Sequence, residues 1–188
     1  MATEIELKYQ ASPALLEQLK NTFPDGYTCI AMTTTYYDTP DGALSARRWT
    51  LRHRQEGTRH ICTLKTPAPG GARGEWEVED DSIIHALEPL EALSGLTLPR
   101  QPVPVCGARF SREAKLLVMD EFTAELALDS GWLHNGEKVQ HFSEIELELK
   151  AGSRQAMEAF GRELEERFGL RVQPKSKFAR AMALGQEG

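Results

Sequence analysis

Long charged side chains recur at every second position in several short segments of the sequence. Glu4, Glu6 and Lys8 alternate with apolar residues near the start of the chain, and Arg52 and Arg54 repeat this spacing further along. Side chains two residues apart point to the same face of a β-strand. Each segment therefore predicts a strand with one charged face and one apolar face.

Three later segments carry the same kind of face. The first segment ends at Lys65, the second carries Arg73, Glu75, Glu77 and Glu79, and the third carries Glu144, Glu146, Glu148 and Lys150. A sheet with one solvated face explains any one of these strands. Like charges two residues apart repel, however, so faces of this kind require opposite charges beside them. Taken together, the segments favour charged faces that meet one another.

The residue types indicate what such a meeting place would bind. Carboxylates from two strands suit a hard divalent cation, because Mg²⁺ prefers oxygen ligands. Paired arginines offer forked donors that match phosphate oxygens, and lysines add point charges. A lone buried charge costs tens of kcal/mol, whereas an opposite charge at about 4 Å regains only about 4 kcal/mol. The pattern therefore predicts a hydrated, charged lumen rather than a dry core.

The pattern along the whole chain predicts mostly strands, with a few helices between them. Strands are expected at 3–9, 33–37, 49–54, 58–65, 74–79, 110–119, 122–128 and 142–150. Helices are expected from Ser12-Pro13 onward, over Ser82 to Leu93 with an interruption at Pro89, over Ser153 to Phe168, and over Ser176 to Leu184. Thr39 to Gly42 and Pro67 to Gly74 have the composition of turns. Residues 1–188 are expected to form one domain of the α+β class.

Composition excludes several classes of function. A net charge of −6 argues against broad binding to nucleic acid or anionic membranes, and no apolar run approaches a membrane span. Three dispersed cysteines do not form a disulfide framework or a cysteine zinc site. The five histidines lack paired ligand spacing. The N-terminus is acidic and alternating, unlike a secretory signal, so a cytoplasmic protein is expected.

Several of these motifs occur in an order that resembles the CYTH, or triphosphate tunnel metalloenzyme, family. The matching segments are Glu4-Ile5-Glu6-Leu7-Lys8, Tyr36-Tyr37-Asp38-Thr39, Leu51-Arg52-His53-Arg54, Thr63-Leu64-Lys65, Arg73-Gly74-Glu75, Arg112, Ser143 to Glu148, and Lys175-Ser176-Lys177 with Arg180. One such motif alone is weak, but this many in order are specific. The resemblance covers almost the whole chain.

The resemblance implies an eight-stranded antiparallel β-barrel tunnel with helices packed outside and substrate phosphates inside. The implied phosphate ligands are Lys8, Arg52, Arg54, Lys65, Arg73, Arg112, Lys177 and Arg180. The implied ligands of Mg²⁺ or Mn²⁺ are Glu4, Glu6, Glu144 and Glu146. The implied catalytic set is Glu4, Glu6, Lys8, Arg52, Arg54 and Lys65. One metal would bridge phosphates and a second would position the attacking water.

The chain departs from the family pattern at two positions. Ala127 stands where family members often have a metal-binding aspartate, and Glu125 and Asp129 share that face as substitutes. Phe110 stands where they often have a lysine, two residues before Arg112. Either Arg109 or Lys115 would compensate there, or one phosphate would be held more weakly.

The chain looks most like bacterial inorganic triphosphatases, which implies hydrolysis of inorganic triphosphate to pyrophosphate and phosphate. Three alternatives stay open: a thiamine or other organic triphosphatase, a class IV adenylyl cyclase, and a non-catalytic polyphosphate-binding module. The first would need an aromatic clamp, which Trp49 or Trp76 could supply. The expected binding partner is a small anionic substrate, and neither nucleic acid nor membrane is expected to bind. The protein is expected to be a monomer or a homodimer.

Overall fold

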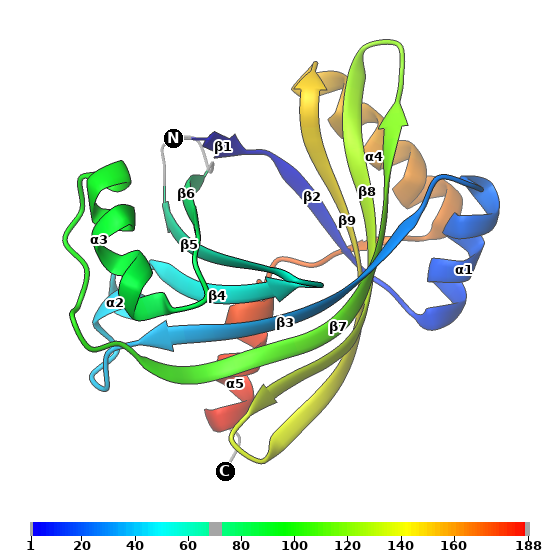
Figure 1. The fold of residues 1–188 in the computed structure, drawn as a ribbon. Coiled ribbons are helices and arrows are strands. Elements are labelled where there is room, and N and C mark those ends of the chain that lie inside the picture. The colour runs from blue at the N-terminus through cyan, green and yellow to red at the C-terminus, as the bar shows by residue number, and fades with distance from the viewer. Residues whose placement is uncertain (1, 68–72, 187–188) are drawn as a thin grey trace.

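The computed structural model describes the backbone of residues 2–67 and 73–186, and the side chains of residues 5–67 and 74–186. Strands dominate these ranges (Figure 1). The strands are β1 (Ala2–Glu4), β2 (Glu6–Gln10), β3 (Thr28–Asp38), β4 (Thr50–Glu56), β5 (Arg59–Pro67), β6 (Arg73–Glu79), β7 (Val103–Val118), β8 (Phe122–Asn135), β9 (Lys138–Gly152) and β10 (Arg171–Val172). The helices are α1 (Pro13–Thr22), α2 (Ala43–Ala46), α3 (Ile83–Ser94), α4 (Arg154–Phe168) and α5 (Lys177–Gln186).

All the described strands belong to one antiparallel sheet in the order β1-β6-β5-β4-β3-β7-β8-β9-β2-β10. β1 and β2 are separated by Ile5 alone, yet β1 pairs with β6 and β2 pairs with β9. The N-terminal segment therefore joins the two ends of a strongly curved sheet (Figure 1). Counted as one interrupted strand, β1 and β2 with β3 to β9 make the expected eight strands, and β10 adds a short ninth. The predicted α+β class and antiparallel sheet are confirmed.

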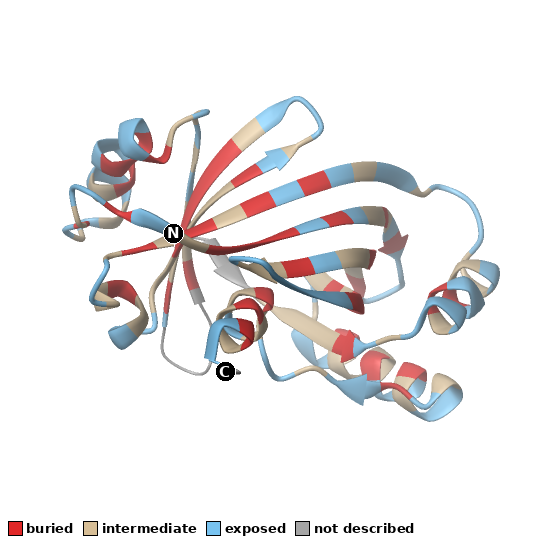
Figure 2. Ribbon diagram, turned by 90° about the horizontal axis from the view of Figure 1, so that it is seen from below, coloured by how far each residue is buried: buried red, intermediate tan, exposed pale blue. Residues whose placement is uncertain are grey.

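Two apolar clusters cover the outer side of the sheet. Helices α1 and α4 pack on β8, β9 and β2 through residues such as Leu19, Leu147 and Met157. Helix α3 packs on β4 to β6 around Leu51 and Leu64. Alternating buried and exposed bands along the strands reflect these two faces (Figure 2). No helix among the described residues is long and apolar enough to span a membrane.

Helix α5 does not follow the expectation that all helices pack outside. It packs through Ala181 and Leu184 on a cluster that includes Tyr36, Phe110 and Phe142. Phe110 lies two residues before Arg112 and Tyr36 is the register partner of Arg52, so this cluster occupies the face that also carries the charged residues. The apolar residues at this end of the inner face explain why α5 lies there.

Helix boundaries follow capping residues. Ser12, Ser82 and Ser153 each accept a hydrogen bond from a backbone N–H in the first turn of α1, α3 and α4. Gly169 closes α4 in the left-handed conformation, as its sequence position predicts. Pro89 lies inside α3 without ending it, so the interruption expected there is wrong. In the Pro67 to Gly74 turn, residues 68–72 lie outside the described residues.

Asp38 fixes the connection between β3 and β4. Its carboxylate is 2% exposed and accepts hydrogen bonds from the backbone N–H groups of Thr39 at 2.7 Å, Leu44 at 2.8 Å and Ser45 at 3.0 Å. The Ser45 hydroxyl donates a further bond at 2.5 Å. Burial alone would raise the pKa of Asp38, but these bonds outweigh burial and lower it below its ordinary value. Asp38 therefore positions the segment that enters β4.

Replacing Asp38 with Asn should lower the free energy of unfolding by about 2 kcal/mol, because the charged acceptor of these bonds is lost. A carboxylate with a depressed folded pKa stabilises the fold above its unfolded pKa of about 4, and this contribution disappears as pH falls through the folded pKa. Urea unfolding should therefore show a gap between wild type and Asp38→Asn that narrows as pH falls from about 5 to about 2. Asp41→Asn, an exposed change in the same loop, is the control. A gap that does not change with pH would contradict this role for Asp38.

Candidate functional site

A cavity of about 350 Å³ opens on the inner face of the curved sheet. Eight lysines and arginines and seven glutamates line it, with few apolar side chains among the described residues. The basic residues are Lys8, Arg52, Arg54, Arg59, Lys65, Arg112, Lys150 and Lys177, and the acidic ones are Glu6, Glu56, Glu75, Glu77, Glu125, Glu146 and Glu148. The predicted charged lumen therefore exists, because the inner-face residues of strands far apart in sequence converge here.

Arg52 and Arg54 on β4 and Lys65 on β5 form one side of the cavity, here called the basic wall. Its counter-ions come from the neighbouring strand β6: Glu75 lies 3.2 Å from Lys65 Nζ and 3.7 Å from Arg52 Nη2. Glu77 lies 3.9 Å from the same Arg52 nitrogen. Arg52 Nε is buried and donates to no acceptor within the described part of the chain. The basic wall thus retains a buried donor that a ligand oxygen would satisfy.

Arg54 has the most constrained position in the basic wall. It is 8% exposed, and its Nε donates to Thr34 Oγ1 at 3.1 Å. Burial, followed by the positive charges of Arg52 and Arg112, lowers the pKa of Arg54 to about 10. Three guanidinium groups therefore repel one another across the cavity. An anion bound between them would relieve that repulsion.

The opposite side of the cavity carries three glutamates from three adjacent strands, here called the acidic row. Glu6 on β2 is the register partner of Glu148 on β9, and Glu148 is the partner of Glu125 on β8. Side chains at directly opposite positions lie about 5 Å apart at Cβ, so like charges there are unfavourable without cations. Lys8 lies 3.5 Å from Glu6 and Lys150 lies 2.8 Å from Glu148. Three carboxylates against two ammonium groups leave the acidic row suited to a divalent cation.

A largely buried charge network, here called the Lys177 cluster, forms part of the cavity lining and extends behind it. It consists of Asp129, Glu144, Glu146, Arg112, Lys177 and Arg180. Arg112 holds Asp129 by two parallel hydrogen bonds of 2.8 Å and also contacts Glu146. Lys177 Nζ lies 2.5 to 2.7 Å from one oxygen of each of the three carboxylates, and Arg180 contacts Glu144.

Electrostatics in the Lys177 cluster favour the charged forms of Glu146 and Lys177. Burial alone would raise the pKa of Glu146, but Arg112 and Lys177 outweigh burial and hold that pKa well below its usual range. Burial likewise would lower the pKa of Lys177, but Asp129, Glu146 and Glu144 raise it above its usual range. Glu146 and Lys177 are therefore fixed charges, whereas burial and the neighbouring Glu146 raise the pKa of Glu144 against the opposing effect of Lys177.

The structure brings most of the sequence-predicted site residues together. Glu6, Lys8, Arg52, Arg54, Lys65, Arg112, Glu146 and Lys177 line the cavity. Asp129, Glu144 and Arg180 lie in the Lys177 cluster but do not line it. Glu4 is the register partner of Arg73 on β6, and the side chains of both lie outside the described ones.

Sequence reasoning missed Arg59 and Glu56, which flank the turn between β4 and β5 and line the cavity. Glu56 continues the face of Arg52 and Arg54 by two residues, and Arg59 is six residues before Lys65 on the same face, so the period of two could have found both. Of the two substitutes for Ala127, Glu125 lies in the cavity and Asp129 beneath it. Arg109 and Lys115 do not line the cavity, so neither takes the place of a lysine at Phe110.

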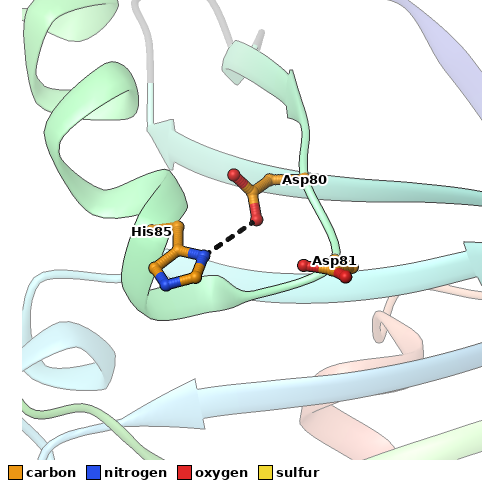
Figure 3. A group of neighbouring side chains, drawn as sticks. All are labelled: Asp80, Asp81 and His85. Carbon is orange, nitrogen blue, oxygen red and sulfur yellow. Dashed lines mark ion pairs between the residues drawn. The ribbon is translucent and has the colours of Figure 1, made fainter.

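A second group of potential metal ligands lies away from the cavity. Asp80, Asp81 and His85 offer oxygen and nitrogen atoms within 4.8 Å of one another at the start of α3 (Figure 3). Asp80 accepts a hydrogen bond from the Ser82 N–H at 2.8 Å and lies 3.7 Å from His85 Nδ1. Acidic groups at a helix N-terminus are stabilised by the helix dipole. Helix capping therefore accounts for this group.

Comparison with known proteins identifies the architecture. The family model of the CYTH domain matches residues 2–182. The chain belongs to the CYTH family. A curated relative, the inorganic triphosphatase of Haemophilus influenzae, is 31% identical over 203 aligned positions, which cover all of this chain and 56% of the relative. The CYTH chain therefore spans about half the length of that relative.

Solved structures support the same fold. The candidate adenylyl cyclase HpAC1 from Hippeastrum, which has a dominant triphosphatase activity, superposes on this CYTH chain with a TM-score of 0.71 at 21% identity. The match covers 96% of this chain and 95% of the other. A candidate adenylate cyclase from Bacillus halodurans gives a TM-score of 0.67 at 21% identity over 94% and 96% of the two chains. At these identities the likeness concerns the fold.

Replacing Arg54 with Ala should weaken pyrophosphate binding at least tenfold, because a charge-assisted hydrogen bond contributes about 1.5 to 3 kcal/mol. Isothermal titration calorimetry in the presence of EDTA measures anion binding without metal or turnover. Arg54→Lys should bind with intermediate affinity, since it keeps the charge but loses the fork. The matched control is Arg154→Ala, which removes an exposed arginine from α4. Equal affinity of Arg54→Ala and wild type would contradict the basic wall as an anion site.

Proposed function

We propose that this CYTH domain hydrolyses inorganic triphosphate to pyrophosphate and phosphate with Mg²⁺ or Mn²⁺ bound. The observation that carries the proposal is the basic wall. Its three cations, Arg52, Arg54 and Lys65, line one side of the cavity. One of their buried donors, Arg52 Nε, has no acceptor in the described residues. Family membership and the Haemophilus influenzae relative support a triphosphatase.

Charge complementarity supports a polyphosphate as the ligand. Arg52, Arg54 and Lys65 would hold phosphate oxygens from one side, and Lys8 and Arg112 would do so from the other. Arg52 and Lys65 are now partly neutralised by Glu75 at 3.7 and 3.2 Å, so a highly charged anion would displace weak ion pairs rather than strong ones. The same guanidinium groups would stabilise negative charge that develops on the leaving pyrophosphate.

The chemistry of the acidic row fits a hard divalent cation. Glu6, Glu125 and Glu148 would hold it, with Glu4 as a further candidate, whereas Glu146 is engaged by Lys177 at 2.6 Å. When bound, the ion would neutralise phosphate charge and lower the pKa of a water molecule. Asp129 and Glu144, assigned to metal on the resemblance, are engaged by Lys177 instead. In the hydrolysis, water would attack the terminal phosphorus as its bond to the bridging oxygen breaks, which gives phosphate, the leaving pyrophosphate and a proton released to solvent.

The position of the tryptophans favours an inorganic substrate over thiamine triphosphate. Trp49 and Trp76 pack with the apolar cluster beneath α3, so they do not form the aromatic clamp considered above. The aromatic residues that line the cavity among the described side chains are Tyr36 and Phe178, whose tilted rings contact each other with 5.2 Å between their centroids. A ring of the substrate would have to disrupt that contact.

A substrate panel tests the proposal. Triphosphate, ATP and thiamine triphosphate are incubated with Mg²⁺ or Mn²⁺, and phosphate, pyrophosphate and cyclic AMP are quantified. Triphosphate should give the highest kcat/KM, with equal amounts of phosphate and pyrophosphate. Glu6→Gln should lower this activity at least about a hundredfold because the acidic row loses a charge, and exposed Glu137→Gln should not. Cyclic AMP as the main product, or triphosphate binding without phosphate release, would refute the proposal.

A further inference from the structure

The ammonium group of Lys177 lies where a metal ion would lie among three carboxylates. Asp129, Glu144 and Glu146 form a group whose oxygen atoms lie within 4.8 Å of one another, the arrangement expected of a cation site. Lys177 Nζ contacts all three, at 2.7 Å from Asp129, 2.5 Å from Glu144 and 2.6 Å from Glu146. The Lys177 side chain is 5% exposed, and those of Asp129 and Glu144 are fully buried.

We propose that Lys177 is a built-in cation that occupies a latent divalent-metal site and closes it to metal ions. Asp129, Glu144 and Glu146 supply the carboxylates of this site. The acidic row of Glu6, Glu125 and Glu148 is then the place left for the metal of the cavity. The proposal concerns cation binding and does not rest on which triphosphate the chain hydrolyses.

The balance of charge in the Lys177 cluster supports the closure. Three carboxylates face three cations, Lys177, Arg112 and Arg180, so their formal charges cancel. A divalent ion added to this set would leave two uncompensated positive charges in a buried region, which is costly. The ion could enter only if the Lys177 ammonium group left the three carboxylates.

The geometry of the contacts supports the same conclusion. The Lys177 ammonium group donates hydrogen bonds to Glu144 at 2.5 Å and Glu146 at 2.6 Å, and it forms an ion pair with Asp129 at 2.7 Å. Arg112 donates two hydrogen bonds of 2.8 Å to the two carboxylate oxygens of Asp129, and Arg180 contacts the second oxygen of Glu144. The site is therefore saturated by groups of the chain itself.

The location of Lys177 gives the built-in cation a positioning role. Glu146 lines the cavity, whereas Asp129 and Glu144 lie behind it. Lys177 is the first residue of α5, which packs on the inner face of β7, β8 and β9. Through the same contacts, the ammonium group thus orients Glu146 and holds the start of α5 against the sheet. A mobile metal ion would make both depend on ion concentration.

Removing the ammonium group should open the latent site. In Lys177→Met, three carboxylates would face two guanidinium groups, which leaves a net negative charge and oxygen ligands suited to Mn²⁺. Electron paramagnetic resonance of free Mn²⁺, without substrate, should count one more bound ion per chain than in wild type. Saturating Mn²⁺ should raise the melting temperature of Lys177→Met by about 5 °C or more above any shift in wild type.

Three controls isolate the site. Lys177→Arg keeps a cation, and Lys175→Met makes the same change at an exposed lysine two residues away, so both should bind as many ions as wild type. The double variant Lys177→Met with Glu144→Gln restores charge balance but removes one carboxylate, so the additional ion should be lost. The proposal is overturned if Lys177→Met gains neither an ion nor stabilisation by Mn²⁺, or if Lys177→Arg gains the ion too.

A second measurement covers the case in which Lys177→Met does not fold without metal. Its refolding should then require Mn²⁺, and failure to refold at saturating Mn²⁺ counts against the proposal. Glu144→Gln with Lys177 retained should bind the same number of Mn²⁺ ions as wild type, because the site is closed. A loss of one ion, or a tenfold weaker affinity, would show that Glu144 binds metal despite Lys177. Loss of triphosphatase activity alone would leave these ion counts unchanged, so the two proposals fail separately.

Discussion

The pairing of opposite charges across neighbouring strands is the constraint on which this structure depends. A strongly curved sheet whose inner face carries many ionised side chains is stable only if each charge meets a counter-charge or water. Lys65 meets Glu75 across β5 and β6, Lys150 meets Glu148 along β9, and Arg112 meets Asp129 across β7 and β8. Each pair joins residues of opposite sign at adjacent positions of the sheet. The placement of opposite charges at neighbouring positions of the antiparallel sheet, rather than any single residue, therefore offsets the free-energy cost of the charged cavity.

The same constraint divides the inner face into parts with different capacity for ligands. In the Lys177 cluster the formal charges balance, and the side chains of Lys177, Asp129 and Glu144 are almost fully buried. In the basic wall, Arg54 lies against Arg52 and Arg112, and the resulting repulsion lowers its pKa. In the acidic row, Lys8 lies near Glu6 and Lys150 near Glu148, so among the described side chains three carboxylates lie beside two ammonium groups. The basic wall thus has an excess of positive charge and the facing acidic row an excess of negative charge. This arrangement favours a polyanion and a cation bound together.

Local periodicity predicted most of the fold and the identity of the cavity wall. Alternation placed Glu6, Lys8, Arg52 and Arg54 on inner faces, because strand geometry depends only on neighbouring residues. It could not predict that α5 packs inside, since that depends on apolar side chains brought together from distant strands. Nor could it predict the partners of Lys177, because they come from β8 and β9 through tertiary register. The outward packing of Trp49 and Trp76 is likewise a tertiary outcome.

Anomalous X-ray diffraction from crystals soaked with Mn²⁺ and triphosphate tests the central claim most directly. The account predicts a manganese peak beside Glu6, Glu125 and Glu148, with phosphate density against Arg52, Arg54 and Lys65. It predicts no manganese among Asp129, Glu144 and Glu146 while Lys177 is present. Manganese confined to Asp80, Asp81 and His85, or phosphate bound on the outer surface, would contradict it.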